Sequence, residues 1–441
     1  MIAWHVYPLG FAGAPIRGGA AQGDTRPDLD ASAEPPLPTG LRHLAGWLDY
    51  AADLGFDTLS LGPVFASQTH GYDTTDHRRI DPRLGTEADF GHLIGQAHAR
   101  GMKVLLDGVF NHVGEEHPLW REALGDGPGR DAARAMFRWE GERPAVFEGH
   151  SSLLVLDHAS DQVAAWVGDI MAHWLERGLD GWRLDAAYAT GPDFWARVLP
   201  GLRQRFPGAY FFGELIHGDA ADFIARSTLD SITQYPLWKA IWSSLKDRNF
   251  FELEWALRGH NSLLAEFAPV TFVGNHDVTR IATQVGHGAA ALATTALLTL
   301  GGSPHIYYGD ELGLTGLKED REGGDDAVRP AFPLRPPDGI VHRGAQDRSR
   351  SGELGASSPA GSGFSPDLAT HALHRSLIRW RAANPWLERA PTEVLELANQ
   401  RLVYRTANPA GSEAVTVTLD LTDLATPRAW ANAPDLNLSI P

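Results

Sequence analysis

Short apolar runs that end in polar or charged residues recur along this chain. The sharpest four are KVLLDGVFNH (103–112), DGWRLD (180–185), YFFGE (210–214) and VTFVGNHD (270–277). Runs of this length fit strands that are buried on both faces, as in a parallel sheet covered by helices. Segments with apolar residues at helical spacing separate the runs. We therefore expect strands and helices to alternate, with right-handed crossovers between parallel strands.

The alternation extends over most of the chain. Further strands are expected at 2–7, 56–64, 231–234 and 305–308, and helices at 41–54, 86–100, 160–177, 192–206, 289–300 and 369–383. We predict an α/β fold, a closed (β/α)8 TIM barrel, formed by residues 1–112 and 157–384. The polar stretch 113–156 is expected to be a short inserted domain after strand three. Short alternating runs in 385–441 predict a small C-terminal antiparallel β domain, and 310–367 is expected to be mostly loop.

The composition narrows the classes of partner. The formal net charge of −17 argues against nucleic acid and anionic membranes, whereas a neutral substrate is compatible with it. Cysteine is absent, which excludes disulfides and thiolate metal sites. The first residues lack the pattern of a signal peptide, and no apolar run is long enough to cross a bilayer. We expect a cytoplasmic protein, and the oligomeric state stays open.

Three carboxylates stand at the ends of predicted strands: Asp185, Glu214 and Asp277. In a closed barrel these strand ends meet in one pocket, so the three side chains are expected to converge. Retaining glycoside cleavage needs a carboxylate nucleophile and a carboxylic acid about 5–5.5 Å apart. A single acidic residue at a strand end is more often a cap or an ion-pair partner. Three together make a purely structural role improbable.

The neighbours of these carboxylates suggest their roles. Arg183 lies two residues before Asp185, so both side chains point into the barrel, and a guanidinium lowers a carboxylate pKa. Asp185 is therefore the expected nucleophile. Glu214 follows an apolar run and the flexible Gly213, and an apolar setting with a nearby anion raises a pKa, as suits a general acid.

Other polar residues complete the predicted pocket. Asp277 is expected to bind sugar hydroxyls and keep Glu214 protonated, and His112 and His276 to donate hydrogen bonds to the sugar. For Asp107 we give equal weight to two roles: it anchors loops, or it belongs to the site.

These segments resemble the ordered motifs of the α-amylase family of glycoside hydrolases (glycoside hydrolase family 13). The matching segments are DGVFNH, GWRLDAA, GEL, FVGNHD, SPHIYYGDELG and, after strand two, HGYDTTDHRRIDPRLGT. The resemblance covers residues 2–383 and implies the barrel, the inserted domain and the C-terminal β domain. It implies Asp185 as nucleophile, Glu214 as acid/base and Asp277 as transition-state stabiliser. It also places four residues around the sugar next to the cleaved bond: Tyr72, His112, Arg183 and His276.

The resemblance suggests further contacts to the substrate. Tyr72 would offer its ring as a stacking platform. Asp73 resembles an Asp with which exo-acting relatives hold the hydroxyls of the non-reducing end, and Arg329 is expected to pair with Asp73 across the pocket.

Some positions depart from the family pattern. Calcium-dependent relatives use Asn and Asp ligands, but only Asn111 has a counterpart here, because Val155 occupies the second position. We therefore expect no cofactor and no metal site. Tyr188 and Ala189 replace a Lys-His pair after the nucleophile. The segments YDTTDH and LDSITQYPLWKAI are most similar to the neopullulanase and cyclomaltodextrinase branch, with the α-glucosidase branch also close.

These observations predict a retaining α-glycoside hydrolase that acts on maltooligosaccharides or short α-glucosides through a covalent glycosyl-Asp intermediate. The same intermediate can also transfer its glycosyl group to a sugar acceptor instead of to water. One alternative is a glucosyltransferase or isomerase of the same family, such as one that rearranges disaccharides into trehalose. Another is a catalytically silent sugar-binding barrel, against which the complete carboxylate set argues. The linkage preference and exo or endo action stay open.

Overall fold

Eight parallel strands form the centre of the molecule in the computed structural model, which describes residues 1–16, 39–321, 323–337, 340, 364–423 and 425–440. Their order in the sheet is β13-β12-β11-β5-β2-β1-β15-β14. A parallel bridge between Thr233 and Val270 joins the two outer strands and closes the ring. The predicted (β/α)8 barrel is therefore confirmed.

The barrel strands are short and almost entirely buried. They are β1 (Ala3–Val6), β2 (Thr58–Leu61), β5 (Lys103–Gly108), β11 (Gly181–Leu184), β12 (Tyr210–Gly213), β13 (Ser231–Ile232), β14 (Val270–Thr271) and β15 (Ser303–Tyr307). All the expected strands are present, and most are shorter than the apolar runs that predicted them. The runs continue into buried loops at the carboxyl ends, which is where the candidate site lies.

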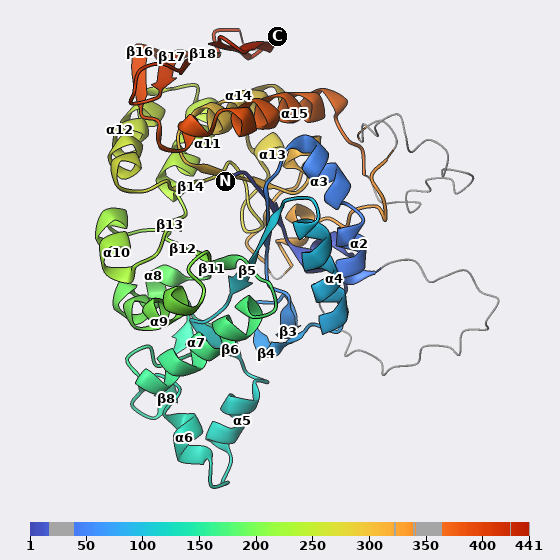
Figure 1. The fold of residues 1–441 in the computed structure, drawn as a ribbon, viewed down its shortest axis with the longest axis vertical. Helices are drawn as coiled ribbons and strands as arrows, with labels where there is room; N and C mark the ends of the chain where they lie inside the picture. Colours follow the sequence, from blue (N-terminus) through green and yellow to red (C-terminus); the bar gives the residue numbers. More distant parts are fainter. Residues whose placement is uncertain (17–38, 322, 338–339, 341–363, 424, 441) are drawn as a thin grey trace, which may run out of the picture.

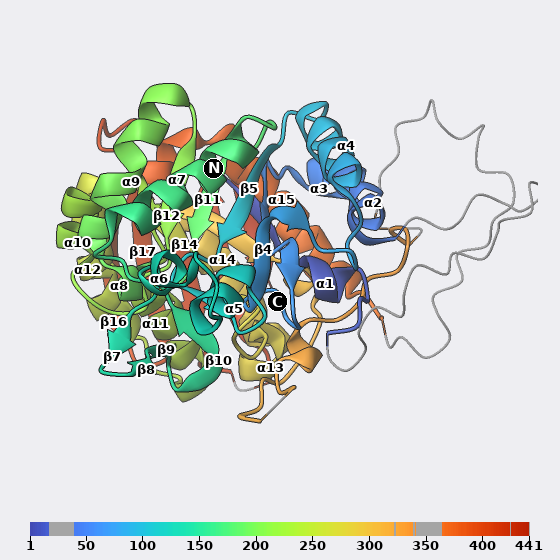
Figure 2. The ribbon, with the colours of Figure 1, turned by 90° about the horizontal axis from the view of Figure 1, so that it is seen from below.

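Helices surround the strands, as Figure 2 shows from below. They include α2 (Gly40–Ala45), α3 (Leu48–Leu54), α4 (Glu87–His98), α7 (Asp161–Leu175), α9 (Pro192–Arg205), α11 (Tyr235–Asp247), α12 (Phe251–Glu266), α14 (His287–Thr299) and α15 (Leu368–Ala383). One expected helix, 41–54, is two helices. The chain breaks at Gly46 and Trp47, where the buried indole of Trp47 donates to the carbonyl of Pro333 at 2.9 Å. Pro333 lies in a loop far away in the sequence, so the spacing of apolar residues around Trp47 could not predict this contact or the break in the helix.

Several elements lie outside the regular alternation. The segment after strand two contains a hairpin of β3 (Phe65–Ser67) and β4 (Thr74–Ile80). Between β5 and α7 the chain forms α5 (Pro118–Leu124), α6 (Arg130–Arg134) and a small antiparallel sheet of β6 (His112–Gly114), β9 (Val146–Phe147) and β10 (His150–Val155). In Figure 1, α5, α6 and the short strand β8 (Arg143–Pro144) project at the end opposite the C-terminus.

The C-terminal part is a five-stranded antiparallel sheet, as predicted. Its strands are β16 (Thr392–Ala398), β17 (Arg401–Ala407), β18 (Ala414–Asp420), β19 (Arg428–Ala433) and β20 (Leu436–Ile440). β19 contacts α14, and β16 contacts α12, so the sheet packs on the outside of the barrel. Alternate side chains of β17 and β18 are buried, as expected of a sheet with one covered face.

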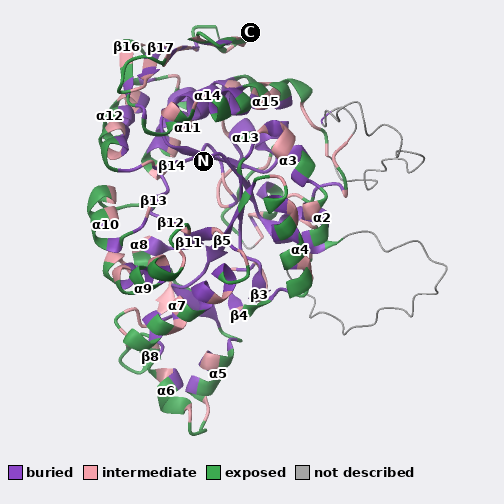
Figure 3. Cartoon of the chain, in the orientation of Figure 1, coloured by how far each residue is buried: buried purple, intermediate pink, exposed green. Residues whose placement is uncertain are grey.

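Burial follows the layers of the fold. Figure 3 shows buried strands at the centre and exposed outer faces on α4, α9 and α10 (Ala220–Ser227). Within the described residues, no helix is both long enough and apolar enough to cross a bilayer. The loop expected at 310–367 falls partly outside the described residues. Its described part contains two short 3-10 helices, Asp310–Leu312 and Asp326–Val328.

Candidate active site

The guanidinium of Arg183 is the centre of a buried polar cluster at the carboxyl ends of the barrel strands. Its Nη1 lies 2.9 Å from Oδ1 of Asp185, and its Nη2 lies 2.7 Å from Oε1 of Glu214. The expectation that Arg183 and Asp185 point the same way is confirmed by the first contact. Because one planar group touches both carboxylates, Asp185 and Glu214 are close neighbours. A short separation of two carboxyl groups is what a retaining glycosidase needs.

Asp107 belongs to the same cluster and lies in the barrel rather than in a loop. It sits opposite Arg183 in the register of β5 and β11 and is fully buried. Its Oδ2 accepts hydrogen bonds from Arg183 at 2.6 Å and from the hydroxyl of Tyr72 at 3.0 Å. Asp107 therefore orients both the guanidinium and the phenol.

Burial controls the protonation of the cluster. It raises the pKa of Asp185 well above its ordinary value, and Arg183 offsets this only in part, because Glu214 and Asp107 act in the same direction as burial. Burial also raises the pKa of Asp107. Arg183 thus lowers the pKa of Asp185, as expected, but burial and the neighbouring acids outweigh its effect. Three carboxylates share the single positive charge of Arg183, so binding of a proton by one of the carboxylates is favoured. General acid catalysis needs a carboxyl group that carries such a proton.

Glu214 is held at the end of β12 by two further donors. The hydroxyl of Tyr235 donates to its Oε1 at 3.0 Å, and the backbone N–H of Ala186 donates to its Oε2 at 3.0 Å. The preceding Gly213 is needed for close packing rather than for flexibility. A Cβ at this position would lie 2.9 Å from a side-chain carbon of Ala187 and of Leu229.

Asp277 follows β14 and lies on the other side of the pocket. Its Oδ1 is 2.9 Å from Nη2 of Arg329, and its Oδ2 is 3.0 Å from Nε2 of His276. Burial opposes ionisation, but His276, followed by Arg329 and Arg183, holds the pKa of Asp277 far below its usual range. The carboxylate is thus ionised and can accept hydrogen bonds from sugar hydroxyls.

His276 connects this pair to the rest of the site. Its Nε2 also contacts the hydroxyl of Tyr72, and the two rings are nearly parallel. On its other edge, Nδ1 lies 3.0 Å from Nε2 of His5 in β1. Both histidines are buried, so a line of polar contacts runs from β1 to Asp277.

The expected pair between Asp73 and Arg329 is not formed, and this prediction is wrong. Asp73 is buried and accepts hydrogen bonds from the backbone and hydroxyl of Thr69 at 3.1 and 2.5 Å. Arg329 contacts Asp277 and Asp325 instead, and its guanidinium lies 4.6 Å from the ring centroid of Tyr7. The carboxylate of Asp73 and the guanidinium of Arg329 are thus each bound by other residues.

His112 is buried in the site, but its ring nitrogens already have partners in the protein. Burial lowers the pKa of His112 to about 3, so the ring is neutral. The carbonyl of Tyr72 can only accept, so Nε2 of His112 donates to it at 3.0 Å, and Nδ1 accepts from Asn111 at 3.1 Å. The expected hydrogen bond from His112 to a sugar would require one of these bonds to break. In this structure the ring supports Tyr72 and stacks on Phe147 at 4.7 Å between centroids.

The calcium site of relatives does not fit these residues. Val155 lies opposite His112 in the register of β10 and β6, and its side chain has no oxygen to offer a hard cation. The side chain of Asn111 is bound to His112. Across the part of the chain that the structure describes, no group of three or more metal-ligating side chains is arranged to hold a metal.

Sequence reasoning missed two residues of the site, Tyr235 and His5. Tyr235 stands in LDSITQYPLWKAI, a segment used only to choose a branch of the family, and its position after a predicted strand was the available signal. His5 lies within the first strand, where a histidine facing the barrel interior cannot be distinguished from an ordinary core residue.

A (β/α)8 barrel with buried carboxylates around an arginine at the strand ends has an architecture typical of glycoside hydrolases. The sequence profile of the alpha-amylase catalytic domain matches residues 39–332. The chain therefore belongs to the α-amylase family, as its motifs indicated.

Individual relatives agree with this assignment. The chain is 32% identical over 310 residues to a cyclomaltodextrinase from Geobacillus thermopakistaniensis (strain MAS1), covering 64% of this chain and 52% of the relative. It is 30% identical over 292 residues to an intracellular maltogenic amylase from Bacillus subtilis (strain 168), covering 63% and 49%. The chain thus spans about half the length of these curated relatives. The fold is similar to that of a cyclic alpha-maltosyl-(1→6)-maltose hydrolase from Arthrobacter globiformis, with a TM-score of 0.75 at 22% identity, covering 100% of this chain and 97% of the other.

Proposed function

We propose that this protein is a retaining α-glycoside hydrolase that acts on maltooligosaccharides or short α-glucosides. The observation that carries the proposal is the double contact of Arg183, which holds Asp185 and Glu214 side by side. The family assignment and the named activities of the relatives support the same class of substrate.

In this proposal Asp185 attacks the anomeric carbon while the glycosidic bond breaks, and Glu214 gives its proton to the leaving oxygen. A glycosyl ester on Asp185 results. Glu214, now ionised, takes a proton from water, the water oxygen attacks the anomeric carbon, and Asp185 is released. When a sugar hydroxyl replaces the water, the same step is transfer to an acceptor.

The remaining residues act on the sugar whose bond is cleaved. Asp277 accepts hydrogen bonds from its hydroxyls, and the ring of Tyr72 supports its face. His276 holds both residues in place. Asp73 stays a candidate contact to the non-reducing end, held ready by Thr69.

We also propose a cytoplasmic location, supported by the similarity to a relative described as intracellular. Fractionation of the source cells would test it, because the proposal requires the protein in the soluble cytoplasmic fraction.

The test is proton NMR with maltotetraose, followed from the first minutes. The wild type is expected to release products that are first α-anomeric, because two inversions at the same carbon preserve configuration. Asp185→Asn should remove this turnover, whereas Asp193→Asn, a change on the outer helix α9, should not. Products that are first β-anomeric, or an Asp185→Asn variant as active as wild type, would contradict the proposal.

A further inference from the structure

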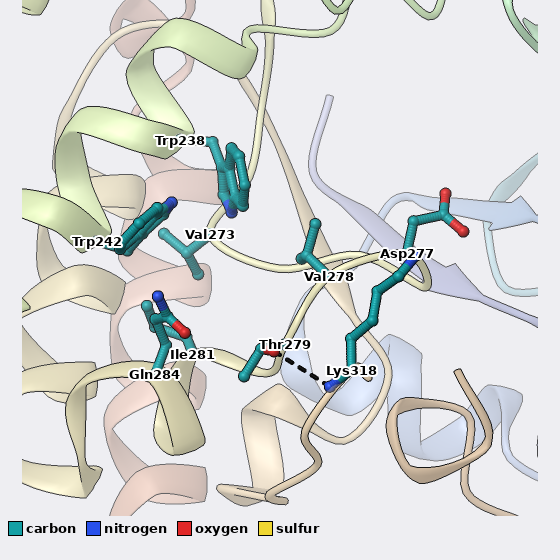
Figure 4. Close-up of a pocket in the computed structure, with 9 residues that line it drawn as sticks. All are labelled: Trp238, Trp242, Val273, Asp277, Val278, Thr279, Ile281, Gln284 and Lys318. Atoms are coloured by element: carbon teal, nitrogen blue, oxygen red, sulfur yellow. Dashed lines mark hydrogen bonds between the residues drawn. The ribbon is translucent and has the colours of Figure 1, made fainter. Parts of the chain in front are cut away.

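Helix α12 lies at the periphery of the molecule, on the outside of the barrel, in both Figure 1 and Figure 2. Its inner face packs against α11, whose Trp238 and Trp242 line the pocket beside Asp277 (Figure 4). The buried residues of α12 recur at helical spacing: Leu253, Ala256, Leu257, His260 and Leu264. The opposite face of α12 is therefore turned to solvent.

Exposed residues of α12 also recur at helical spacing and form what we call the outer stripe: Phe251, Trp255, Arg258, Gly259, Ser262 and Ala265. The first half of the outer stripe is aromatic. Trp255 is the most exposed large apolar side chain among the described residues, at 73%, and Phe251, one turn before it, is 50% exposed. Neighbouring apolar side chains on a surface mark an interaction site, whereas single ones do not.

Strand β16 brings a further apolar side chain to this surface. The side chain of Asn261 in α12 exchanges two hydrogen bonds with the backbone of Thr392, at 2.7 and 2.9 Å. Just before the helix, the backbone N–H of Phe250 donates to the carbonyl of Asn399 at 3.0 Å. The strand therefore runs antiparallel to the helix, and Leu395, which is 52% exposed, lies beside the aromatic half of α12.

The second half of the outer stripe is made of small residues. Outside the helix's own backbone and the two chain neighbours, no described atom lies within 4 Å of the position that a Cβ of Gly259 would occupy. The helix surface therefore has an open notch at Gly259. The hydroxyl of Ser262 donates to the carbonyl of Arg258 at 3.3 Å and so stays close to the helix. A stripe with one bulky half and one small half fits a second copy of itself that runs in the opposite direction.

The charged side chains of this surface are neutralised within the chain. Arg258 pairs with Glu254 at 2.6 Å, and Lys239 of α11 pairs with Glu252. These pairs leave the aromatic half of the stripe without a local excess of charge. The net charge of −17, which repels a second copy, is thus not concentrated here, and a strongly charged partner finds little to bind.

We propose that α12 is the interface of a homodimer, in which the two copies of the helix pack antiparallel about a two-fold axis beside Leu257. In this register Trp255 of one copy lies over the notch at Gly259 of the other, and Phe251 lies over Ser262. Arg258 then lies beside the ring of Trp255 of the second copy, where a guanidinium is favourable. The two-fold axis repeats every contact, so the bulky half of each copy is covered by the small half of the other.

The size of the interface sets the expected affinity. Helix α12 has 16 residues and is about 24 Å long. One helix pair of this length, even with Leu395 beside it, buries less than the roughly 800 Å² per partner of a standard stable interface. We therefore expect a dissociation constant in the micromolar range.

Sedimentation velocity of the full-length protein across the micromolar range tests the proposal. The wild type should convert from monomer to dimer as its concentration rises. Trp255→Ala should weaken this association by about tenfold or more. Gly259→Leu adds apolar surface but fills the notch, so it should also weaken the dimer, whereas non-specific apolar association would become stronger. Leu124→Ala on α5 is the matched control, because this side chain is 61% exposed and lies outside α12.

The absence of cysteine from the chain allows a direct test of the antiparallel register. Phe251→Cys and Ser262→Cys proteins, when mixed, should be joined by a short bismaleimide cross-linker. Neither protein alone should be cross-linked, because the two copies of each residue lie about 16 Å apart along the helix axes. Circular dichroism checks that each variant is folded, and Gly259→Leu replaces a poor helix former by a good one.

Three results would overturn the proposal. The first is a wild type that stays monomeric across the micromolar range. The second is a dimer that Trp255→Ala and Gly259→Leu leave unchanged, since the copies would then meet at another face. The third is efficient cross-linking of Phe251→Cys to itself, which an antiparallel pair forbids. A monomeric wild type whose affinity for maltooligosaccharides falls in Trp255→Ala would show instead that the outer stripe binds a glucan.

Discussion

The backbone N–H of Ala186 donates to Oε2 of Glu214 at 3.0 Å from a left-handed conformation, with φ 45° and ψ 39°. Residues with a Cβ rarely adopt this conformation, which costs about 1–3 kcal/mol. Ala186 directly follows Asp185. The chain therefore bends sharply just after Asp185. This bend lets the side chain of Asp185 enter the site while the N–H of the next residue, Ala186, binds the carboxylate of Glu214.

Replacement of Ala186 tests whether this strain belongs to the site. A β-branched side chain tolerates the left-handed region worse than alanine, so Ala186→Val should lower the free energy of unfolding by about 1–3 kcal/mol and reduce kcat. Ala186→Gly is the matched control, because glycine adopts the conformation freely and keeps the N–H. It should retain most of the activity. Urea unfolding measures the free energy of unfolding, and initial rates on maltotetraose measure kcat. An Ala186→Val variant with wild-type stability and wild-type kcat would disprove the prediction.

The contact between His5 and His276 predicts a positioning role for His5. Burial, followed by His276 and His305, lowers the pKa of His5 well below its usual range, so its ring is neutral. His5→Phe keeps a ring of similar size but leaves Nδ1 of His276 without its partner, and a buried unpaired group costs about 1–3 kcal/mol. We expect kcat to fall about tenfold with a smaller change in KM.

The conservative variant distinguishes this role from simple packing. His5→Gln can place an amide near Nδ1 of His276, so it should recover much of the lost kcat and the wild-type pH profile. If His5→Gln and His5→Phe are equally impaired, or if only stability changes, the ring of His5 serves packing alone.

The order of the barrel strands and the positions of the proposed catalytic residues can both be predicted from the sequence. Asp185, Glu214 and Asp277 each follow a buried apolar run, and the closure of the barrel brings them together. Protonation is different, because the pKa of Asp185 depends on burial depth and on acids from other strands. The partner of Arg329 depends on the path of a long loop, which leads it to Asp277 rather than Asp73. Neither property is encoded by local periodicity.

The corrected pairing of Arg329 can be tested by double-mutant cycles on the free energy of unfolding. Arg329 contacts Asp277 at 2.9 Å, so Arg329→Met and Asp277→Asn should couple by more than about 0.5 kcal/mol. The contribution stays modest, because 37% of the Asp277 side chain is exposed and water screens the pair. Arg329→Met and Asp73→Asn share no contact and should add within about 0.5 kcal/mol. If instead the Arg329 and Asp73 changes coupled and the Arg329 and Asp277 changes were additive, Arg329 would pair with Asp73, as the sequence led us to expect.

Glu311 predicts an unusual dependence of stability on pH. The residue is fully buried after β15, accepts hydrogen bonds from Gly309 at 2.8 Å and Tyr50 at 3.1 Å, and has its pKa raised by burial to about 7. An unfolded Glu titrates at about 4.3, so between these two values the folded state binds more protons than the unfolded state. The free energy of unfolding contributed by this group must therefore fall as pH rises from about 4.5 to 7.

Glu311→Gln removes the group that titrates while it keeps the shape: the amide oxygen can accept from the N–H of Gly309, and the NH2 can donate to the hydroxyl oxygen of Tyr50. We expect the variant to be more stable than wild type at pH 8 by about 3 to 4 kcal/mol, with little difference at pH 4.5. The neighbouring Asp310, whose pKa burial raises to about 6, remains in the variant and leaves a smaller slope of the same sign. Glu115→Gln, at an exposed position, is the control and should parallel wild type. Urea unfolding at a series of pH values decides the matter, and parallel curves for wild type and Glu311→Gln would show that Glu311 is ionised in the folded protein without penalty.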